Sequence, residues 1–247
     1  MAAVPQPIIH VRELCYTYPH GPAALEAVSF DVSPGETVGL VGPNGAGKTT
    51  VFLCLAGVVV PAAAALRLSG LDLRDASERR KLPCKVGIVF QNSDDQLINA
   101  TVFDDVAFGP LNLGLPPDEV RARVAEALAK VGLNGVEKRV PWHLSGGEKR
   151  RVALAGVLAM RPEVLLLDEP SMYLDPRGRR ELIALLPTLG GTQVIASHDL
   201  ELVLHTCGRV LVLDGGRLIA EGATRTILGD AGLMEAHGLE VPASLAR

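Results

Sequence analysis

The chain has 247 residues and a formal net charge of -4, and it is 48% hydrophobic but only 4% aromatic. This length suits one large domain, although two small ones would also fit, and the interior should rest on Val, Leu, Ile and Ala. The acidic balance leaves no broad electrostatic footprint for DNA or RNA, so nucleic acid is not expected as a partner.

Four cysteines are scattered without a C-x-x-C pair, which disfavours a zinc site and indicates buried or free thiols in a reducing compartment. The first residues lack the basic segment and apolar stretch of a signal peptide, so a cytoplasmic protein is expected. Residues 49–66 are uncharged, but Gly57 and Pro61 interrupt them, which favours a buried helix and a turn over a membrane span. Any membrane role must therefore come through a partner.

Apolar runs bounded by turn residues predict the secondary structure in chain order. The first part should contain strands at 8–18, 25–32, 37–41 and 85–90 and a helix at 48–56. Residues 101–160 instead contain residue types that typically start and end helices, and helices are expected at about 117–130 and 148–160. Further strands are expected at 164–167, 193–196, 209–213 and 217–221, with a helix at 176–186.

This alternation predicts an α/β fold with a mostly parallel sheet covered by helices. A small antiparallel β layer should precede it, and a helical insert should occupy residues 101–160. Residues 1–222 are expected to form one domain, and residues 223–247 a tail with one or two short helices.

Residues 42–50 read GPNGAGKTT and fit the pattern G-x-x-x-x-G-K-[ST]. Glycines in this pattern let backbone N–H groups close on phosphates, while Lys48 reaches the outer phosphates and the Thr49 hydroxyl takes Mg²⁺. The motif therefore predicts ATP and Mg²⁺ as cofactors. The predicted nucleotide contacts in this loop are Gly42, Pro43, Asn44, Gly45, Ala46, Gly47, Lys48, Thr49 and Thr50.

Residues 164–170, VLLLDEP, place two acids at the carboxyl end of a buried strand, where α/β sheets bind ligands. Asp168 is predicted to hold Mg²⁺ through water, and Glu169 to polarise the attacking water. A solvated Glu169 ahead of a turn is the alternative, which the presence of Lys48 and Thr49 makes the weaker one.

Gln91 and His198 also follow predicted strands. The Gln91 amide can reach toward Mg²⁺ and water, and a neutral His198 imidazole could hydrogen-bond the terminal phosphate and orient the water of Glu169. Taken alone, Gln91 would be a surface residue and His198 a structural one.

Residues 144–151, LSGGEKRR, form a Ser-Gly-Gly turn that leads into the helix expected from about 148. A helix start offers free amides and a positive dipole end to an anion, which makes Ser145, Gly146 and Gly147 candidates for a second phosphate contact. Judged from the local sequence, an ordinary helix cap is the favoured interpretation.

Together these motifs resemble the ATP-binding subunit of ABC transporters over residues 8–222. The resemblance implies a P-loop NTPase (ABC ATPase) core and ATP hydrolysis. It also implies an ATP-dependent dimer, in which the LSGG segment of one protomer closes on the ATP of the other. The catalytic candidates are then Lys48, Gln91, Glu169 and His198, and the metal ligands Thr49, Gln91 and Asp168.

The same resemblance gives a role to two further places. Tyr18 would stack on adenine, with Tyr16 as the rival candidate. Residues 171–176, SMYLDP, match the D-loop, which puts Asp175 at the dimer seam, although two bulky residues stand where many relatives have small ones.

Residues 91–115 bear a narrower resemblance, through their DDQ and DVAFGP elements, to the energy-coupling factor importers of bacteria and archaea. With residues 171–186, the segment is most similar to cobalt or nickel importers, with vitamin importers next. This implies integral-membrane partner subunits and a peripheral place on the cytoplasmic face of the membrane, either as a homodimer or with a second ATPase subunit. A soluble ABC ATPase and a non-hydrolysing regulatory module compete with it, and the intact Lys48 and Glu169 disfavour the latter.

The segment also offers apolar side chains to a helix of a membrane subunit. Leu97 and Ile98, nearest to Gln91, are the predicted docking contacts. Val102 and Phe108 could equally pack the core of the insert itself.

Overall fold

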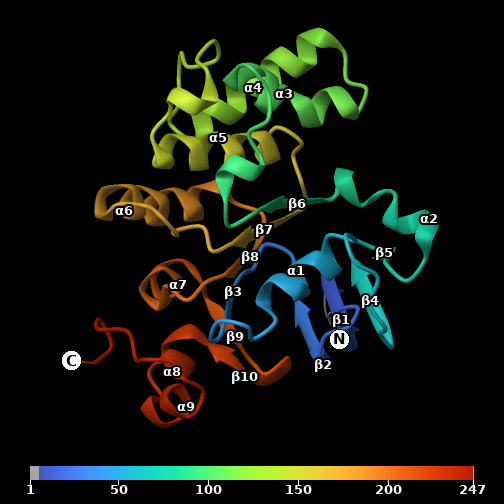
Figure 1. Ribbon diagram of the computed structural model, residues 1–247, viewed down its shortest axis with the longest axis vertical. Coiled ribbons are helices and arrows are strands. Elements are labelled where there is room, and N and C mark those ends of the chain that lie inside the picture. The colour runs from blue at the N-terminus through green and yellow to red at the C-terminus, as the bar shows by residue number, and fades with distance from the viewer. Residues whose placement is uncertain (1–5, 247) are drawn as a thin grey trace, which may run out of the picture.

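The computed structural model describes residues 6–246, which form a central sheet, a smaller second sheet and a helical region (Figure 1). The central sheet has the strand order β10-β9-β3-β8-β7-β6. Its strands are β3 (Thr37–Val41), β6 (Val86–Val89), β7 (Val164–Asp168), β8 (Thr192–Ala196), β9 (Arg209–Asp214) and β10 (Arg217–Ala223). All neighbours from β6 to β9 are parallel, and β10 pairs with β9 in antiparallel orientation. The predicted mostly parallel sheet is confirmed.

The central strands are apolar on both faces because other elements cover both. In β7, Leu165 and Leu167 pack into one cluster of buried side chains, whereas Val164 and Leu166 pack into a second cluster on the opposite face. Burial on both faces is typical of parallel strands and explains their continuous apolar runs. The polar residues of these segments therefore come at the strand ends.

The second sheet is antiparallel and has the order β2-β1-β4-β5. Its strands are β1 (Ile9–Thr17), β2 (Ala23–Val32), β4 (Ala65–Leu68) and β5 (Leu71–Asp72). Together with α1 (Lys48–Leu55) and one face of the central sheet, it encloses a core around the fully buried Phe52. The small β layer and the buried helix predicted at this point of the chain are confirmed.

The helical insert lies between β6 and β7, at the end of the molecule away from the C terminus (Figure 1). Its helices are α3 (Val102–Asn112), α4 (Pro117–Lys130) and α5 (Gly146–Leu158). α4 has the predicted bounds, but α5 begins two residues before 148. The reason is a capping box, in which the Ser145 hydroxyl accepts from the Glu148 N–H and the Glu148 carboxylate accepts from the Ser145 N–H.

The remaining helices connect strands or follow the last one. They are α2 (Ala76–Arg79), α6 (Pro176–Leu185), α7 (Leu200–Thr206), α8 (Thr224–Leu228) and α9 (Ala231–Ala236), with 3-10 turns η1 (Leu82–Cys84), η2 (Ser93–Asp95), η3 (Pro141–His143) and η4 (Leu186–Leu189). α7 was not predicted, because seven residues are too few for a helical period to stand out. Between residues 6 and 246, no helix is both long enough and apolar enough to cross a bilayer.

The segment between β6 and α3 corrects one prediction. Leu97 is only 3% exposed and belongs to the core of the insert, so it is not available for docking. Its neighbour Ile98 is 68% exposed. Val102 is fully buried, whereas Phe108 is 53% exposed. Adjacent side chains point in different directions, which is why Leu97 and Ile98 cannot act as one contact.

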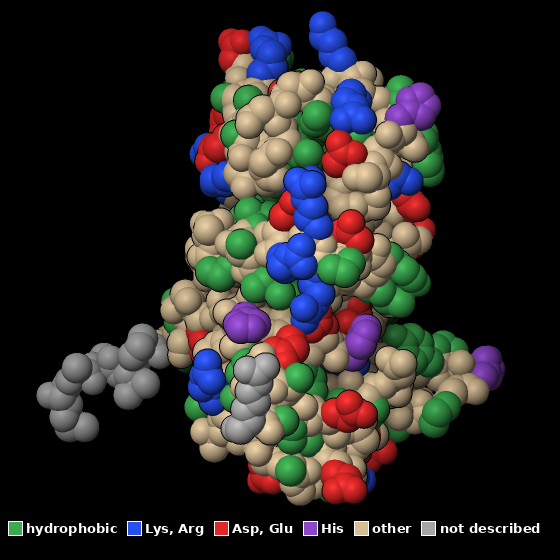
Figure 2. Space-filling view, turned by 90° about the vertical axis from the view of Figure 1, so that its left-hand side faces the viewer, with side chains coloured by type: hydrophobic (Ala, Val, Ile, Leu, Met, Phe, Trp, Pro, Cys, Tyr) green, Lys and Arg blue, Asp and Glu red, His purple; other side chains and the backbone are tan. Residues whose placement is uncertain are grey.

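The surface carries charges of both signs. Figure 2 shows one face, on which Lys and Arg side chains form a column with Asp and Glu beside it. Exposed pairs such as Arg177–Glu181 at 2.9 Å are screened by water and add little to stability. All four cysteines are free thiols, as predicted, and burial raises the pKa of Cys54 and Cys207 to about 12.

Candidate active site

The glycine-rich loop joins β3 to α1 at the carboxyl end of the central strands. Gly47 has a φ of +104°, and a Cβ there would come within 2.7 Å of the Ala24 carbonyl oxygen, so only glycine fits. The loop borders a cavity of about 610 Å³. Its lining residues are Tyr18, Ala24, Asn44, Gly45, Ala46, Gly47, Lys48, Thr49, Thr50, Gln91, Asp168, Glu169, Met172 and His198.

Most predicted site residues therefore meet in one cavity. Gly42 and Pro43 do not line it, but their carbonyl oxygens hold its lysine. The segment Ser145–Gly147 lies elsewhere, at the start of α5. Ala24 and Met172 line the cavity without having been predicted, because an alanine on a strand carries no chemical signal and Met172 was noted only for its bulk.

Lys48 stands at the centre of the loop and is 7% exposed. Its Nζ donates to the carbonyl oxygens of Gly42 at 2.7 Å and Pro43 at 3.1 Å, and lies 3.9 Å from Oε1 of Glu169. Burial lowers the pKa of the Lys48 ammonium, and the two neighbouring carboxylates oppose this shift. The loop thus presents a cation that carbonyl oxygens hold in place.

Asp168 ends β7 and is 2% exposed. Its Oδ2 accepts a hydrogen bond from the Thr49 hydroxyl at 2.8 Å, while its Oδ1 is buried without a partner among residues 6–246. Burial raises the pKa of the Asp168 carboxyl. An unpartnered buried carboxylate oxygen beside a hydroxyl is a donor set that suits a hard cation such as Mg²⁺.

Glu169 is 6% exposed, which rules out the solvated alternative. Its carboxylate accepts from the Ser197 hydroxyl at 3.1 Å and from the His198 backbone N–H at 3.1 Å, and the His198 Nδ1 lies 2.8 Å from its Oε2. Its φ of +45° is unusual for a non-glycine residue. Several hydrogen-bond partners therefore orient the Glu169 carboxylate at the edge of the cavity, and the backbone that carries it is strained.

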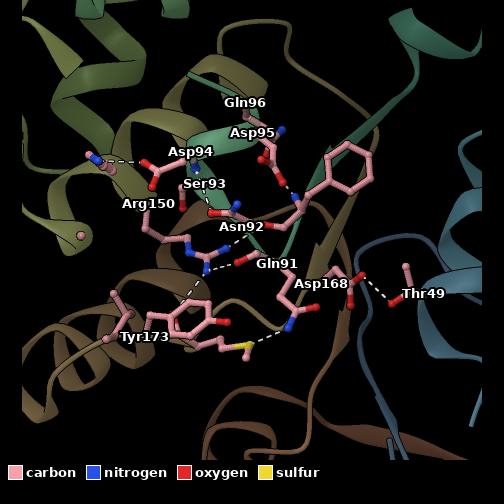
Figure 3. Close-up of a pocket in the computed structure, with 15 residues that line it drawn as sticks. Thr49, Gln91, Asn92, Ser93, Asp94, Asp95, Gln96, Arg150, Asp168 and Tyr173 are labelled. Carbon is pink, nitrogen blue, oxygen red and sulfur yellow. Dashed lines mark hydrogen bonds and ion pairs between the residues drawn. The ribbon is translucent and has the colours of Figure 1, made fainter. Parts of the chain in front are cut away.

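Gln91 lies two residues after the end of β6 and also lines the cavity. Its Nε2 contacts the Sδ of Met172 at 2.6 Å. A second cavity of about 780 Å³ begins at this point and extends past Asp168 and Tyr173 to Gly146 of α5 (Figure 3). Gln91 therefore lies between the glycine-rich loop and the insert.

Tyr18 lines the cavity at 39% exposure, and its hydroxyl lies 3.3 Å from the Thr50 hydroxyl. Tyr16 meets its ring edge-on at 4.9 Å and packs against the core instead. Of the two tyrosines, only Tyr18 lines this cavity.

Comparisons with known proteins now decide the family. Residues 25–172 match the family model described as ABC transporter. The energy-coupling factor transporter ATP-binding protein EcfA of Methanothermobacter thermautotrophicus is 51% identical, over 95% of this chain and 77% of its own. The chain belongs to the ABC transporter family. The predicted membership of this family and the predicted enzyme class, an ATP hydrolase of the ABC type, are confirmed.

Solved ABC proteins have the same fold. CbiO1 of Clostridium perfringens, described as part of the ABC transporter complex CbiONQ, is 38% identical with a TM-score of 0.83, covering 94% of both chains. A dimeric ATP-binding cassette solved with ADP and phosphate is 27% identical with a TM-score of 0.78, covering 87% of this chain and 98% of its own. The ABC ATPase fold is thereby confirmed.

Arg150 is a further residue that sequence reasoning missed. It lies in the LSGGEKRR segment and is 4% exposed, whereas its neighbour Arg151 forms a half-exposed ion pair with Glu181. Two consecutive arginines look alike in the sequence. The only available signal was the helical period, which puts Arg150 on the same face as the buried Leu154.

Proposed function

We propose that this chain is the ATP-hydrolysing subunit of an energy-coupling factor importer for cobalt or nickel ions. The observation that carries the proposal is the 51% identity to an EcfA protein over 95% of the chain. The likeness to CbiO1 at 38% identity supports it. The metal cargo rests on the resemblance of residues 91–115 together with residues 171–186, and a vitamin importer of the same group is the alternative.

In this proposal the glycine-rich loop and Lys48 bind the phosphates of ATP, and Tyr18 stacks on the adenine. Thr49, Gln91 and Asp168 would hold Mg²⁺, which fits the unpartnered Oδ1 of Asp168. Mg²⁺ supplies charge compensation at the phosphoryl oxygens when bound.

Glu169 polarises the attacking water in the proposed reaction. Ser197 and the His198 N–H fix its carboxylate, so it need not reorganise when the water arrives. The His198 ring is 57% exposed, and its Nδ1 lies 2.8 Å from Oε2 of Glu169, which leaves Nε2 for the terminal phosphate. This proximity supports the proposed roles of both residues.

Two copies would form the complete catalytic unit. The start of α5, with Ser145, Gly146 and Gly147, lies outside the nucleotide cavity of its own chain. In this proposal it meets the ATP of a partner. Asp175 caps α6 by accepting from the Gly178 N–H at 2.7 Å and is proposed to lie at the seam. The similarity to dimeric cassettes supports this arrangement.

The membrane partner is proposed to dock beside the insert. A groove of about 380 Å³ lies between β6, α3 and α5, and Val58, Ile88, Phe108 and Met160 are among its lining residues. Ile98 is exposed on the same segment. A helix of an integral-membrane subunit could cover this apolar surface and hold the chain peripherally on the cytoplasmic face of the membrane.

Co-purification from membranes followed by uptake measurements tests the proposal. The chain should be recovered with integral-membrane proteins, and cells that produce this complex should accumulate radioactive cobalt or nickel. The Glu169→Gln complex is the matched control and should assemble without uptake. Accumulation of a vitamin instead would support the alternative, and recovery from the soluble fraction alone would contradict a transport role.

A further inference from the structure

A single side chain from α5 reaches the two loops that flank the nucleotide cavity. Nη1 of Arg150 donates to the Phe90 carbonyl oxygen at 2.7 Å. Its Nη2 donates to the carbonyl oxygens of Gln91 at 2.5 Å and Met172 at 3.3 Å. Figure 3 shows the guanidinium pointing at these loops from the side of α5. Arg150 thus joins the start of α5 to the segments that follow β6 and β7.

Packing alone does not explain a buried arginine at this place. In the part of the chain that the structure describes, every hydrogen-bond partner of Arg150 is a neutral carbonyl. Burial lowers the pKa of its guanidinium, and the charge of Asp168 opposes this. A buried cation without a paired carboxylate is costly, and an apolar side chain of similar volume would cost less.

The far end of the loop after β6 is anchored to α3, where the buried Asp105 accepts from the Ile98 and Asn99 N–H groups. The part of the loop next to Gln91 is held differently. Gln96 ties the loop back to its own strand, since Oε1 accepts from the Phe90 N–H at 2.9 Å and Nε2 donates to the Ile88 carbonyl at 3.1 Å. Lys149 pairs with Asp94 at 2.8 Å, but this pair is partly exposed and contributes about 0–1 kcal/mol. Arg150 is therefore the buried connection between Gln91 and α5.

Building on the proposed function, we propose that Arg150 is a positioning residue that couples the two nucleotide sites of the dimer. Gln91 lines the chain's own ATP cavity, and the start of α5 serves the ATP of the partner. A phosphate that draws the Gln91 side chain also moves its carbonyl. The planar guanidinium donates to the Phe90 and Gln91 carbonyls at once, so a movement of this loop also moves α5.

The chain contains its own reporter for this movement. Trp142 is the single tryptophan, is 61% exposed, and lies in η3 just before the LSGG segment. The Nζ of Lys149 lies 5.5 Å from the centre of its ring, and the same Nζ binds Asp94. A shift of α5 against the loop changes the distance between Lys149 and Asp94. The Lys149 ammonium then moves relative to the Trp142 ring, which changes the tryptophan emission.

The test compares Arg150→Met with the parent and with Arg151→Met, which removes the Arg151–Glu181 pair from the next position of the same helix. ATP affinity is measured by equilibrium dialysis, and Trp142 emission is followed in dilute protein as ATP and Mg²⁺ are added. We expect Arg150→Met to keep the parent's affinity and melting temperature but to lose most of the emission change. Its Hill coefficient for hydrolysis should fall to about 1. Arg151→Met should behave like the parent.

A full emission change in Arg150→Met would overturn the inference. If that variant melts early, Arg150→Lys decides, because a single ammonium nitrogen lacks the fork of two nitrogens with which the guanidinium reaches the Phe90, Gln91 and Met172 carbonyls. A partial emission change at parent stability then supports the inference, and a parent-like change overturns it. A parent protein that binds no ATP would refute the proposed function itself. A parent that binds ATP without any emission change would refute only the coupling.

Discussion

The carboxyl edge of the central sheet and the outer face of the helical insert meet their partners in opposite ways. At the sheet edge, Lys48, Asp168 and Glu169 are polar yet buried, and each forms a hydrogen bond with a neighbouring residue. On the insert, Ile98 and Phe108 are apolar yet exposed. The first region is organised for a small anion, whereas the second offers apolar area to another protein.

This difference separates chemistry from assembly. Substitutions at the sheet edge should change nucleotide binding or turnover in the isolated chain. Substitutions on the exposed face of the insert should change association and leave the isolated chain as it is. Four experiments test whether the two regions can be separated in this way.

Lys48→Ala should have the largest effect, because it removes a buried charge that faces the phosphates. Losing one partner of such a pair costs about 2–5 kcal/mol, so ATP affinity should fall by about 30-fold or more. Isothermal titration with Mg²⁺ and ATP measures it. Lys130→Ala at the end of α4 is the control on the insert and should keep the parent's affinity. Unchanged affinity in Lys48→Ala would mean that the loop is not the ATP site.

Glu169→Gln should lower hydrolysis by about 10²–10⁴-fold while ATP affinity is kept, because only the water-polarising charge is lost. ATP that is not hydrolysed should then hold two chains together, and light scattering should detect a dimer with ATP but not with ADP. Ser145→Arg in this background should prevent the dimer by filling the start of α5. Parent-rate hydrolysis by Glu169→Gln would disprove its catalytic role.

Replacing Ile98 and Phe108 together by Asp should uncouple assembly from chemistry. Membrane association and metal uptake should fall, while the melting temperature and ATP affinity of the isolated chain should hold, since both side chains are exposed. Leu97→Asp is the contrasting variant. It puts a charge into a buried apolar position and should destabilise the fold by about 3 kcal/mol or more. Normal uptake by the double variant would exclude this docking surface.

Asp168→Asn should produce the smallest effect, a change in stability that depends on pH. Burial raises the pKa of Asp168 above 3.8, so the carboxyl favours folding below about pH 3.8 and opposes it as the pH rises through the folded value. The nucleotide-free variant should therefore melt higher at pH 7, by about 2–4 °C for each kcal/mol, and the gain should vanish in acid. Calorimetry at both pH values measures this.

Asp199→Asn is the matched control with the opposite sign. Burial alone would raise the pKa of Asp199, but its hydrogen bonds with Arg179 and the Leu202 N–H, together with the charge of Arg179, outweigh burial and lower the pKa. The ionised carboxylate therefore stabilises the fold at pH 7, and Asp199→Asn should melt lower there. If the melting temperatures of both variants shifted equally at pH 7, burial would not be the cause of the raised pKa at Asp168.

Much of the molecule could be predicted because short-range rules decide it. The bounds of α4 follow from a proline start and a basic end, and β3 and β7 follow from apolar runs between turn residues. The glycine-rich loop was recognisable because its backbone conformation admits few other residues at Gly47. These features need no information from distant parts of the chain.

The errors have two sources. The start of α5 depends on a local capping box between Ser145 and Glu148, which the sequence already contains. The exposure of Leu97 and Ile98 depends instead on which side of their loop faces the insert. The sequence alone determined that this chain holds a phosphate loop, two strand-end acids and alternating strands and helices, because spacing and residue type encode them. Only the tertiary structure decided that Tyr18 rather than Tyr16 reaches the cavity and that Arg150 is buried across two loops. Burial is a property of the neighbours a side chain meets in the fold, and a single sequence does not contain them.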